Sequence, residues 1–225
     1  MSALMLATAN AHKVEEYQDL FPGIALMSLA DLPPAPEVVE DAPDFEGNAL
    51  IKARDARGRS GQVALADDSG LCVDALDGAP GVYSARYAPG RDADRVQALL
   101  AAMAAEPDDR TARFVCVIAV AGVPDDVPLP PGAWRDADCV LVRGEVEGRL
   151  AHAPRGTGGF GYDPIFELPG GAVVAELPAA EKHAISHRGV AARAILPLLR
   201  ALVGRGLIER RRRPRAPEGG RRFFV

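Results

Sequence analysis

RFVCVIAVA, residues 113–121, is apolar at every position after Arg113. A short apolar run that contains several β-branched residues predicts a strand covered on both faces. Residues 138–148 (DCVLVRGEVEG) alternate enough to predict a second strand, which returns after a proline-rich segment. Long central strands with a returning neighbour predict a mixed sheet.

The segments on either side alternate between strand and helix patterns. We expect strands over residues 3–8, 25–29 and 62–71, and helices over residues 11–21, 45–60, 92–105 and 186–203. The strand over 62–71 (QVALADDSGL) is expected to end in its two acids and a glycine turn, and Pro197 is expected to kink the last helix. Strands alternating with helices predict an α/β fold, in which helices flank a mixed central sheet.

One domain over residues 1–204 accounts for this pattern. Residues 122–137 contain four prolines, so we expect a surface insertion without regular structure. Residues 205–225 contain eight arginines and two acids, and we expect them to form a disordered tail.

The charge balance argues against a nucleic-acid surface outside that tail. Without the tail the chain carries 18 basic and 29 acidic residues, an unfavourable balance for binding a polyanion. No apolar run approaches about 18 residues, so no membrane span is expected. The N-terminus lacks the basic region of a signal peptide, and the three scattered cysteines suit reduced thiols. These features predict a cytoplasmic protein.

The first candidate site is TANAHK, which comprises Thr8, Ala9, Asn10, Ala11, His12 and Lys13. It lies where the first strand gives way to a helix. Main-chain N–H groups and the helix dipole attract phosphate at such a position, and Lys13 adds a positive charge one turn inside the helix. The alternative is an ordinary turn, capped by Asn10, with a surface lysine.

The second candidate site is the pair Asp67 and Asp68, followed by Ser69. Adjacent carboxylates beside an apolar strand are costly unless their charge is compensated. Mg²⁺ prefers oxygen ligands, and one or two carboxylates together with substrate phosphate hold it. The alternative is a polar turn in which one of the two acids caps a neighbouring segment.

The third candidate site is the loop GTGGFGYDP, residues 156–164. Its first six residues match the dinucleotide pattern G-x-G-x-x-G, but that pattern should leave a strand and open a helix. Here Pro154 precedes the glycines and Pro164 follows them, so we reject the dinucleotide interpretation. A glycine-rich loop that displays Phe160 and Tyr162 suits contact with a base or sugar, whereas the alternative is a hinge with two packed aromatic rings.

The fourth candidate site is EKHAISHRG, residues 181–189. Its two histidines, His183 and His187, are four residues apart, but the HExxH glutamate of a zinc site is missing. A phosphate-binding Lys182 and a base-reading pair, His187 and Arg188, suit the segment better. The alternative is a solvated cationic helix start.

Together these motifs resemble the inosine triphosphate pyrophosphatase family, whose members are also called dITP/XTP pyrophosphatases. The resemblance runs over about residues 3–203 and rests on five blocks that occur in the same order, namely TANAHK, FEGNALIKA, ADDSGLCVDALDGAPGVYSARYA, GTGGFGYDPIF and EKHAISHRG.

The resemblance implies a Mg²⁺-dependent enzyme that cleanses the nucleotide pool by hydrolysing ITP, dITP and XTP to a monophosphate and pyrophosphate. It also implies a homodimer in which the sheet divides two lobes, with the nucleotide in the cleft between them. Asp68 would be the proton acceptor and a Mg²⁺ ligand. The nucleotide would be surrounded by Thr8, Ala9, Asn10, Ala11, His12, Lys13, Ser69, Phe160, Gly161, Tyr162, Asp163, Lys182, His187 and Arg188.

The chain departs from the family at one position of the helix motif. The family commonly has Glu-Asn-Ala where this chain has Gly47-Asn48-Ala49, so a carboxylate associated with metal binding is missing. Glu40 or Glu46 could replace it, and we expect Glu40 to do so.

The expected chemistry is an attack on the α-phosphorus. A triphosphate carries about four negative charges, so the reaction needs cations on both sides of it. We expect Lys13 and Lys182 to neutralise the leaving pyrophosphate. Arg188 is expected to read the purine 6-position, where inosine and xanthine present an oxygen and adenine an amino group.

Three other functions are compatible with parts of the sequence. The enzyme could act on damaged pyrimidine nucleotides instead, or the chain could bind nucleotides as a regulator without hydrolysing them. The arginine-rich tail could bind nucleic acid, in addition to any of these functions.

Overall fold

The computed structural model describes residues 2–105 and 109–211. In chain order the strands are β1 (Leu4–Leu6), β2 (Leu26–Ser28), β3 (Ala64–Val73), β4 (Thr111–Ala121), β5 (Trp134–Asp136), β6 (Cys139–Leu150) and β7 (Phe166–Glu167). The helices are α1 (Ala11–Leu20), α2 (Phe45–Ser60), α3 (Asp92–Ala102), α4 (Ala179–Ile185) and α5 (His187–Gly204).

The strands form one mixed sheet, which confirms the predicted fold class. The strand order is β2-β1-β3-β4-β6-β5, and β7 pairs with β6. β1 runs parallel to β2 and β3, whereas β3, β4 and β6 form long antiparallel ladders. β4 has a strand on each side, and its residues from Val115 to Ala121 are completely buried, as expected for a central strand.

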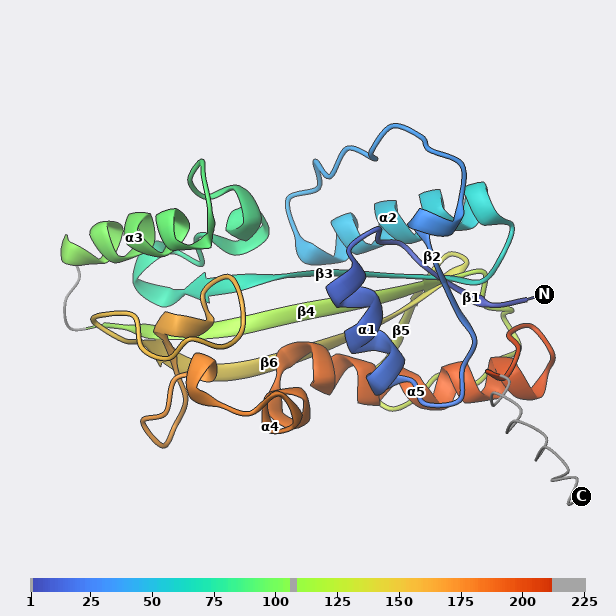
Figure 1. Ribbon diagram of the computed structural model, residues 1–225. Coiled ribbons are helices and arrows are strands. Elements are labelled where there is room, and N and C mark those ends of the chain that lie inside the picture. Colours follow the sequence, from blue (N-terminus) through green and yellow to red (C-terminus); the bar gives the residue numbers. More distant parts are fainter. Residues whose placement is uncertain (1, 106–108, 212–225) are drawn as a thin grey trace, which may run out of the picture.

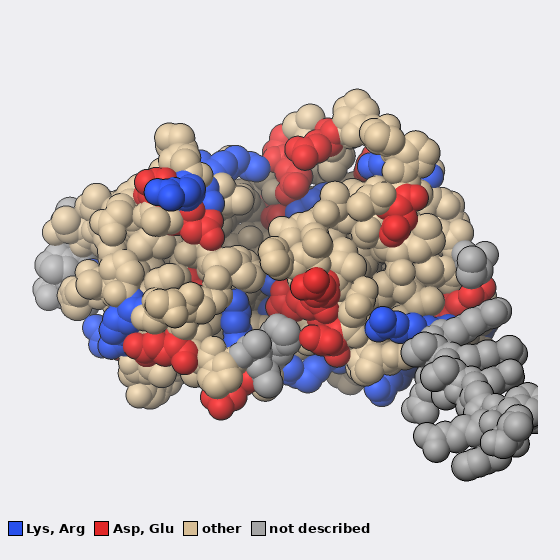
Figure 2. Space-filling model, in the orientation of Figure 1, with Lys and Arg blue, Asp and Glu red and all other residues tan. Residues whose placement is uncertain are grey.

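Helices cover both faces of the sheet (Figure 1). Because side chains alternate along a strand, Val115 and Val117 of β4 pack in the cluster that contains α2. Cys116 and Ile118 pack in the cluster that contains α5. A separate cluster at the far end of the long strands contains Leu71 of β3 and residues of α3. Figure 2 shows the surface hollowed between the part that carries α3 and the part that carries α2.

The strand predicted over residues 62–71 does not end at its two acids, and that prediction was wrong. β3 continues through them to Val73, with Asp67 opposite Ile118 and Asp68 opposite Val117 of β4. Acids and a glycine resemble a turn in the sequence, but β4 offers an uninterrupted partner along the whole of β3. Cations from other elements compensate both carboxylates, as described below.

The proline-rich segment 122–137 also contains a strand, so the prediction of no regular structure was wrong for residues 134–136. These residues form β5, which pairs with the edge of β6. The segment is also partly inside the molecule, since Val123 and Val127 are buried in the main core. Arg135 donates to the carbonyl oxygens of Val123 and Pro124, each at 3.0 Å.

The first residues of the arginine-rich segment pack on the domain. Ile208 is 1% exposed in the main core, and residues 209–211 pair with the main chain of residues 23–25. Arg205 pairs with Asp126 at 2.8 Å. The prediction of disorder was therefore wrong for residues 205–211, and for residues 212–225, which lie outside the described residues, it stays a prediction.

The last helix begins where the sequence predicted. Ser186 caps α5 by accepting a hydrogen bond from Gly189 N at 3.0 Å, and Pro197 lies inside the helix without ending it. None of the helices in the described ranges, 2–105 and 109–211, is both long and apolar enough to cross a membrane.

Candidate active site

The edge of β3 opens where β1 ends. Ala7 N donates to Leu65 O, and this is the last backbone contact between the two segments. Farther along, the short helix η3 (Gly81–Arg86) covers the same edge, where Leu71 N donates to Ser84 Oγ at 2.9 Å. Asp67 and Asp68 lie in the interval, and among the described residues no backbone pairing fills it. A ligand at this edge has access to both carboxylates.

Asp67 points to the α5 side of the sheet, where it is surrounded by cations. Its Oδ2 accepts hydrogen bonds from Nε and Nη2 of Arg188 at 3.3 and 3.1 Å. Lys13 Nζ lies 3.2 Å from both carboxylate oxygens. Burial alone would raise the pKa of Asp67, but the charges of Lys13, Arg188 and Lys52 outweigh it and lower that pKa. Asp67 is therefore ionised and holds two cations at the open edge.

Arg188 is almost completely buried and is held by a second carboxylate. Its Nη1 donates to Glu16 Oε2 at 3.0 Å, and its Nη2 donates to Ser69 Oγ at 3.2 Å. Four of its five N–H groups thus have acceptors among the described residues. The position of the guanidinium is fixed before any substrate arrives.

Asp68 points to the opposite, α2 side of the sheet. Its Oδ1 lies 2.7 Å from Lys52 Nζ, which also contacts Glu40 Oε2 at 2.9 Å. Asn48, 1% exposed, donates to Asp68 Oδ2 at 3.4 Å and accepts from Ala42 N at 3.1 Å. Burial raises the pKa of Asp68 despite the nearby ammonium of Lys52.

A cavity of about 210 Å³ opens beside the Asp67 face. Its walls come from α1, β3, β4, α3, the glycine-rich loop and the start of α5. Among the residues that line it are the predicted site residues Lys13, Ser69, Phe160, Gly161, Tyr162, Asp163, Lys182, His187 and Arg188. Segments more than 150 residues apart in the sequence thus meet around one space large enough for a purine base.

The aromatic residues of this cavity differ in exposure. Phe160 is 54% exposed, and Lys182 Nζ lies 4.3 Å from the centre of its ring. Tyr162 is buried and donates to Ser84 O at 2.9 Å, so it is a packed wall and not a displayed ring. His187 stacks on Phe114 at 4.8 Å, and burial lowers the pKa of its imidazole well below the ordinary value. A neutral imidazole can donate one hydrogen bond and accept another.

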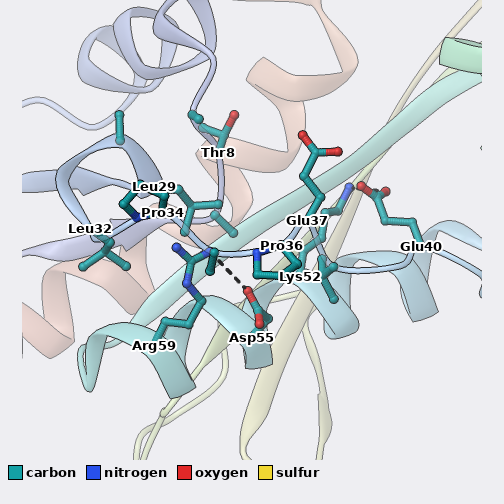
Figure 3. A pocket seen from close by; sticks show the side chains of 15 residues that line it. Thr8, Leu29, Leu32, Pro34, Pro36, Glu37, Glu40, Lys52, Asp55 and Arg59 are labelled. Atoms are coloured by element: carbon teal, nitrogen blue, oxygen red, sulfur yellow. Dashed lines mark hydrogen bonds and ion pairs between the residues drawn. The ribbon is translucent and has the colours of Figure 1, made fainter.

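A second cavity, of about 480 Å³, lies on the Asp68 side (Figure 3). Thr8 and Ala9 contribute to one wall, and Glu40 and Lys52 to another. The rest is largely apolar and comes from the loop that contains Pro34 and from α2. In Figure 3 the side chains of Glu37, Glu40 and Lys52 extend into the same region.

The remaining residues of the predicted phosphate motif shape the turn. Thr8 Oγ1 accepts from Asn10 N at 3.1 Å, and the Asn10 side chain caps α1 by accepting from the amides of His12 and Lys13. The predicted cap is thus present. Ala11 lines neither of these two cavities, and the His12 side chain is 94% exposed. The start of α1 faces the open edge mainly through Lys13.

Lys52, Asn48 and Glu16 are the residues that sequence reasoning did not place in the site. The chain has only three lysines, Lys13, Lys52 and Lys182, and all three pair with buried or half-buried acids here. The scarcity of lysine was therefore the available signal for Lys52. Glu16 lies on the same face of α1 as Lys13, three residues later, which was the signal for its position.

The donors on the Asp68 side suit a magnesium ion. Oxygens of Glu40 and Asp68 converge on one cation, the Lys52 ammonium, so two carboxylates already point at a common centre of positive charge. Mg²⁺ needs one or two carboxylates and completes its shell with water and phosphate. Within residues 2–105 and 109–211 no cluster of three or more acids, histidines or cysteines forms a metal cage, so the protein would supply only part of that shell.

Comparisons with known proteins agree with this geometry. The chain matches the Ham1 family over residues 4–198. A dITP/XTP pyrophosphatase of Symbiobacterium thermophilum is 53% identical over 204 residues, which cover 90% of this chain and 98% of that protein. A protein of the same name from Streptomyces coelicolor is 44% identical over 212 residues, which cover 91% of this chain and 100% of that protein.

Solved structures show the same fold. A HAM1 protein from Coxiella burnetii is 40% identical, with a TM-score of 0.79 over 89% of this chain and 100% of that one. A nucleoside-triphosphatase, or dITP/XTP pyrophosphatase, from Mycobacterium abscessus is 42% identical, with a TM-score of 0.68 over 87% of this chain and 99% of that one. The family match and these identities confirm the resemblance seen in the sequence motifs: the chain belongs to the Ham1 family.

Proposed function

We propose that this chain is a nucleoside-triphosphate pyrophosphohydrolase, which converts dITP, XTP and ITP to the monophosphate and pyrophosphate with Mg²⁺. Relatives that are 44–53% identical over nearly their whole length carry the name dITP/XTP pyrophosphatase. The observation that carries the proposal is the open edge of β3. There Asp67 forms ion pairs with Lys13 and Arg188 on one face. On the other face Asp68 and Glu40 both form ion pairs with Lys52.

This arrangement suits a triphosphate that crosses the edge between the two cavities. The base would enter the cavity beside Arg188, and the phosphates would pass Lys13 toward Lys52. Positive charge on both sides of the edge offsets the charge that develops on the phosphates during attack. Lys182 contacts Phe160 and Asp163, so its first role in this arrangement is beside the nucleoside.

Glu40 and Asp68 would hold the magnesium ion. When bound, Mg²⁺ neutralises phosphate charge and increases the acidity of a water molecule. Asp68 would accept the proton of the attacking water. Lys52 would hold the two carboxylates near each other before the metal arrives.

The selectivity would come from Arg188 and His187. Among the described residues, the contacts with Asp67, Glu16 and Ser69 use four of the five N–H groups of Arg188, and the fifth would donate to the oxygen at the purine 6-position. An adenine amino group at that place would leave the donor unpaired. The neutral imidazole of His187 would accept or donate one further hydrogen bond.

The proposal also includes a homodimer with two lobes per subunit and a cytoplasmic location, where polymerases draw on the nucleotide pool. Light scattering coupled to size-exclusion chromatography would measure the mass in solution. A mass twice that of the 23.7 kDa chain supports the dimer, and the mass of one chain contradicts it.

The activity is tested by mixing the protein with dITP and Mg²⁺ and following the products by ³¹P NMR. Pyrophosphate and dIMP are expected in equal amounts. Orthophosphate with dIDP, or no turnover, would contradict the proposal. A panel that includes damaged pyrimidine triphosphates separates the proposed substrates from the pyrimidine alternative, and binding without product would indicate a regulator.

A further inference from the structure

The glycine-rich loop separates the base cavity from another cavity. Phe160 and Gly161 line both the base cavity and a space of about 240 Å³ on the other side, where Thr157 and Gly158 join them. Residues 157–160 are exposed and have little packing to hold their position, whereas Tyr162 is buried and donates to Ser84 O at 2.9 Å. The hydrogen bonds of the exposed part of the loop therefore decide where that part lies.

One end of the loop is tied to the body by two contacts. Gly158 N donates to Ala175 O at 3.0 Å. Phe160 N donates to Asp163 Oδ2 at 2.9 Å, and the same oxygen binds Lys182 Nζ at 2.6 Å. The two acceptors lie in Asp163, near the end of the loop, and in the short helix η6 (Val174–Glu176), which contains Ala175.

The other end is tied to a separate element, α3. Gly161 N donates to Asp92 Oδ2 at 2.6 Å, a charge-assisted hydrogen bond. Asp92 is the first residue of α3, and its other oxygen pairs with Arg95, which in turn donates to Gly90 O at 2.9 Å. The hydrogen bond from Gly161 is the main reason that the pKa of Asp92 is lowered. Gly161 itself has φ +61°, which a residue with a side chain rarely adopts.

We infer that Asp92 is a positioning residue for substrate: through Gly161 it fixes the exposed part of the loop, which carries Phe160 to the base cavity. This inference rests on the proposed function, because it assigns the cavity to the base. Asp92 and Arg95 of α3 also line the base cavity, but neither pairs with Asp67 or Asp68 among the described residues. Its loss should weaken nucleotide binding more than it slows the chemical step.

The experiment compares Asp92→Ala and Asp92→Asn with Asp94→Ala as the matched control. Asp94 lies in the same first turn of α3 and accepts from Arg91 N at 2.7 Å, so its removal weakens the helix start without touching the loop. Steady-state kinetics with dITP at saturating Mg²⁺ give KM and kcat separately. Hydrogen exchange, measured by mass spectrometry across residues 156–163 without substrate, reports the position of the loop itself.

Asp92→Ala is expected to raise KM about tenfold with a much smaller change in kcat, the scale expected for losing a hydrogen bond to a charged group. Asp92→Asn keeps an acceptor oxygen and should recover about half of that change on a logarithmic scale, because charge-assisted hydrogen bonds are roughly twice as strong as neutral ones. Exchange across the loop should accelerate in Asp92→Ala and stay at the wild-type rate in Asp94→Ala.

Equal KM values for Asp92→Ala and Asp94→Ala would overturn the inference, and so would unchanged exchange in the loop. If Asp92→Ala does not fold, Asp92→Asn decides by the same two measurements. The exchange measurement needs no turnover. A wild-type protein that fails to hydrolyse dITP would therefore contradict the proposed function, while loop exchange still tests the contact between Asp92 and Gly161.

Discussion

Asp68 is the residue on which the proposed chemistry depends most directly. Asp68→Asn keeps the size of the side chain and its contact with Asn48, but removes the proton acceptor and one negative metal ligand. We expect kcat for dITP to fall at least about 100-fold, the lower limit for loss of a positioned general base. Pyrophosphate release at saturating Mg²⁺ measures this.

Asp74→Asn is the control for that variant. Asp74 follows β3 directly and pairs with Arg113 at 2.9 Å, outside both cavities. Near-normal kcat in Asp68→Asn, or an equal loss in both variants, would contradict the assignment of Asp68.

Arg188 is the residue expected to determine base selectivity. We expect Arg188→Lys to lower the ratio of kcat/KM for ITP over ATP by about tenfold to a hundredfold, because an ammonium lacks the planar fork that the carboxylates hold. Competition assays with both nucleotides give the ratio. Arg188→Ala should lower it similarly, but it also leaves Asp67 and Glu16 without their buried cation. An unchanged ratio in Arg188→Lys would assign the reading of the base to another group.

At the scale of elements, Gly47 shows how the helix α2 receives the loop that carries Glu40. A Cβ atom at position 47 would lie 2.5 Å from Ala42 Cβ and 3.0 Å from Asp44 Oδ1, closer than neighbouring atoms tolerate. The loop therefore lies against α2 only because residue 47 has no side chain. This gives a physical reason for glycine at the position where the family commonly has glutamate.

Gly47→Ala is expected to displace the loop and with it Glu40. The Mg²⁺ concentration for half-maximal rate should rise about tenfold, since changes in the groups that orient metal ligands cost 10- to 100-fold in affinity. Gly58→Ala, in the same helix but facing open space, should leave the Mg²⁺ response unchanged and raise stability by about 0.5–1 kcal/mol. Identical Mg²⁺ titrations of the two variants would show that Glu40 does not bind the metal.

The sequence predicted elements well where a pattern was local. The central strand, the helix over 45–60 and the cap at Asn10 all follow from side-chain periodicity and capping chemistry. The continuation of β3 through its two acids cannot be predicted in this way, because it depends on pairing with Ile118 and Val117 of β4, which lie far along the chain. β5 was missed for the same reason, since it is a strand only by virtue of its pairing with β6.

The grouping of the site residues could be predicted from the motifs, but their partners could not. Lys13, Lys182 and Arg188 do lie around one cavity. Sequence reasoning treated Asp67 and Asp68 as one candidate site, with Asp68 and Glu40 as the metal ligands, whereas alternation along β3 sends the two acids to opposite faces. Only the observation that both acids are inside a strand reveals this, and that observation needs β4.

At the scale of the whole molecule, residues 205–211 close the fold. They bring Ile208 into the main core and join Glu209 to Ser2, whose carbonyl oxygen accepts from Glu209 N at 2.7 Å. Deletion of residues 208–225 should therefore destabilise the domain by at least about 2–5 kcal/mol, the range for truncating a buried isoleucine. Urea unfolding followed by circular dichroism measures this loss.

Deletion of residues 212–225 is the matched truncation. It removes five of the eight arginines of the segment, with none of the contacts described above. We expect the same urea midpoint as the full chain. If the shorter deletion abolished a salt-dependent binding of DNA, the tail would have a function of its own. A midpoint as low as that of the longer deletion would show that residues 212–225 contribute to the fold.

The placement of Asp67 and Asp68 on opposite faces of one strand has a consequence for mutation. Side chains on a strand have a period of two, so deleting any one residue from Ala64 to Ala66 would move each later residue of β3 to the opposite face. Asp68 would take the position of Asp67 and would still meet Lys13 and Arg188, whereas Ser69 would take the position of Asp68 beside Lys52. Substitutions can change this site by degrees, but a single-codon deletion upstream would remove the carboxylate of the metal side in one step.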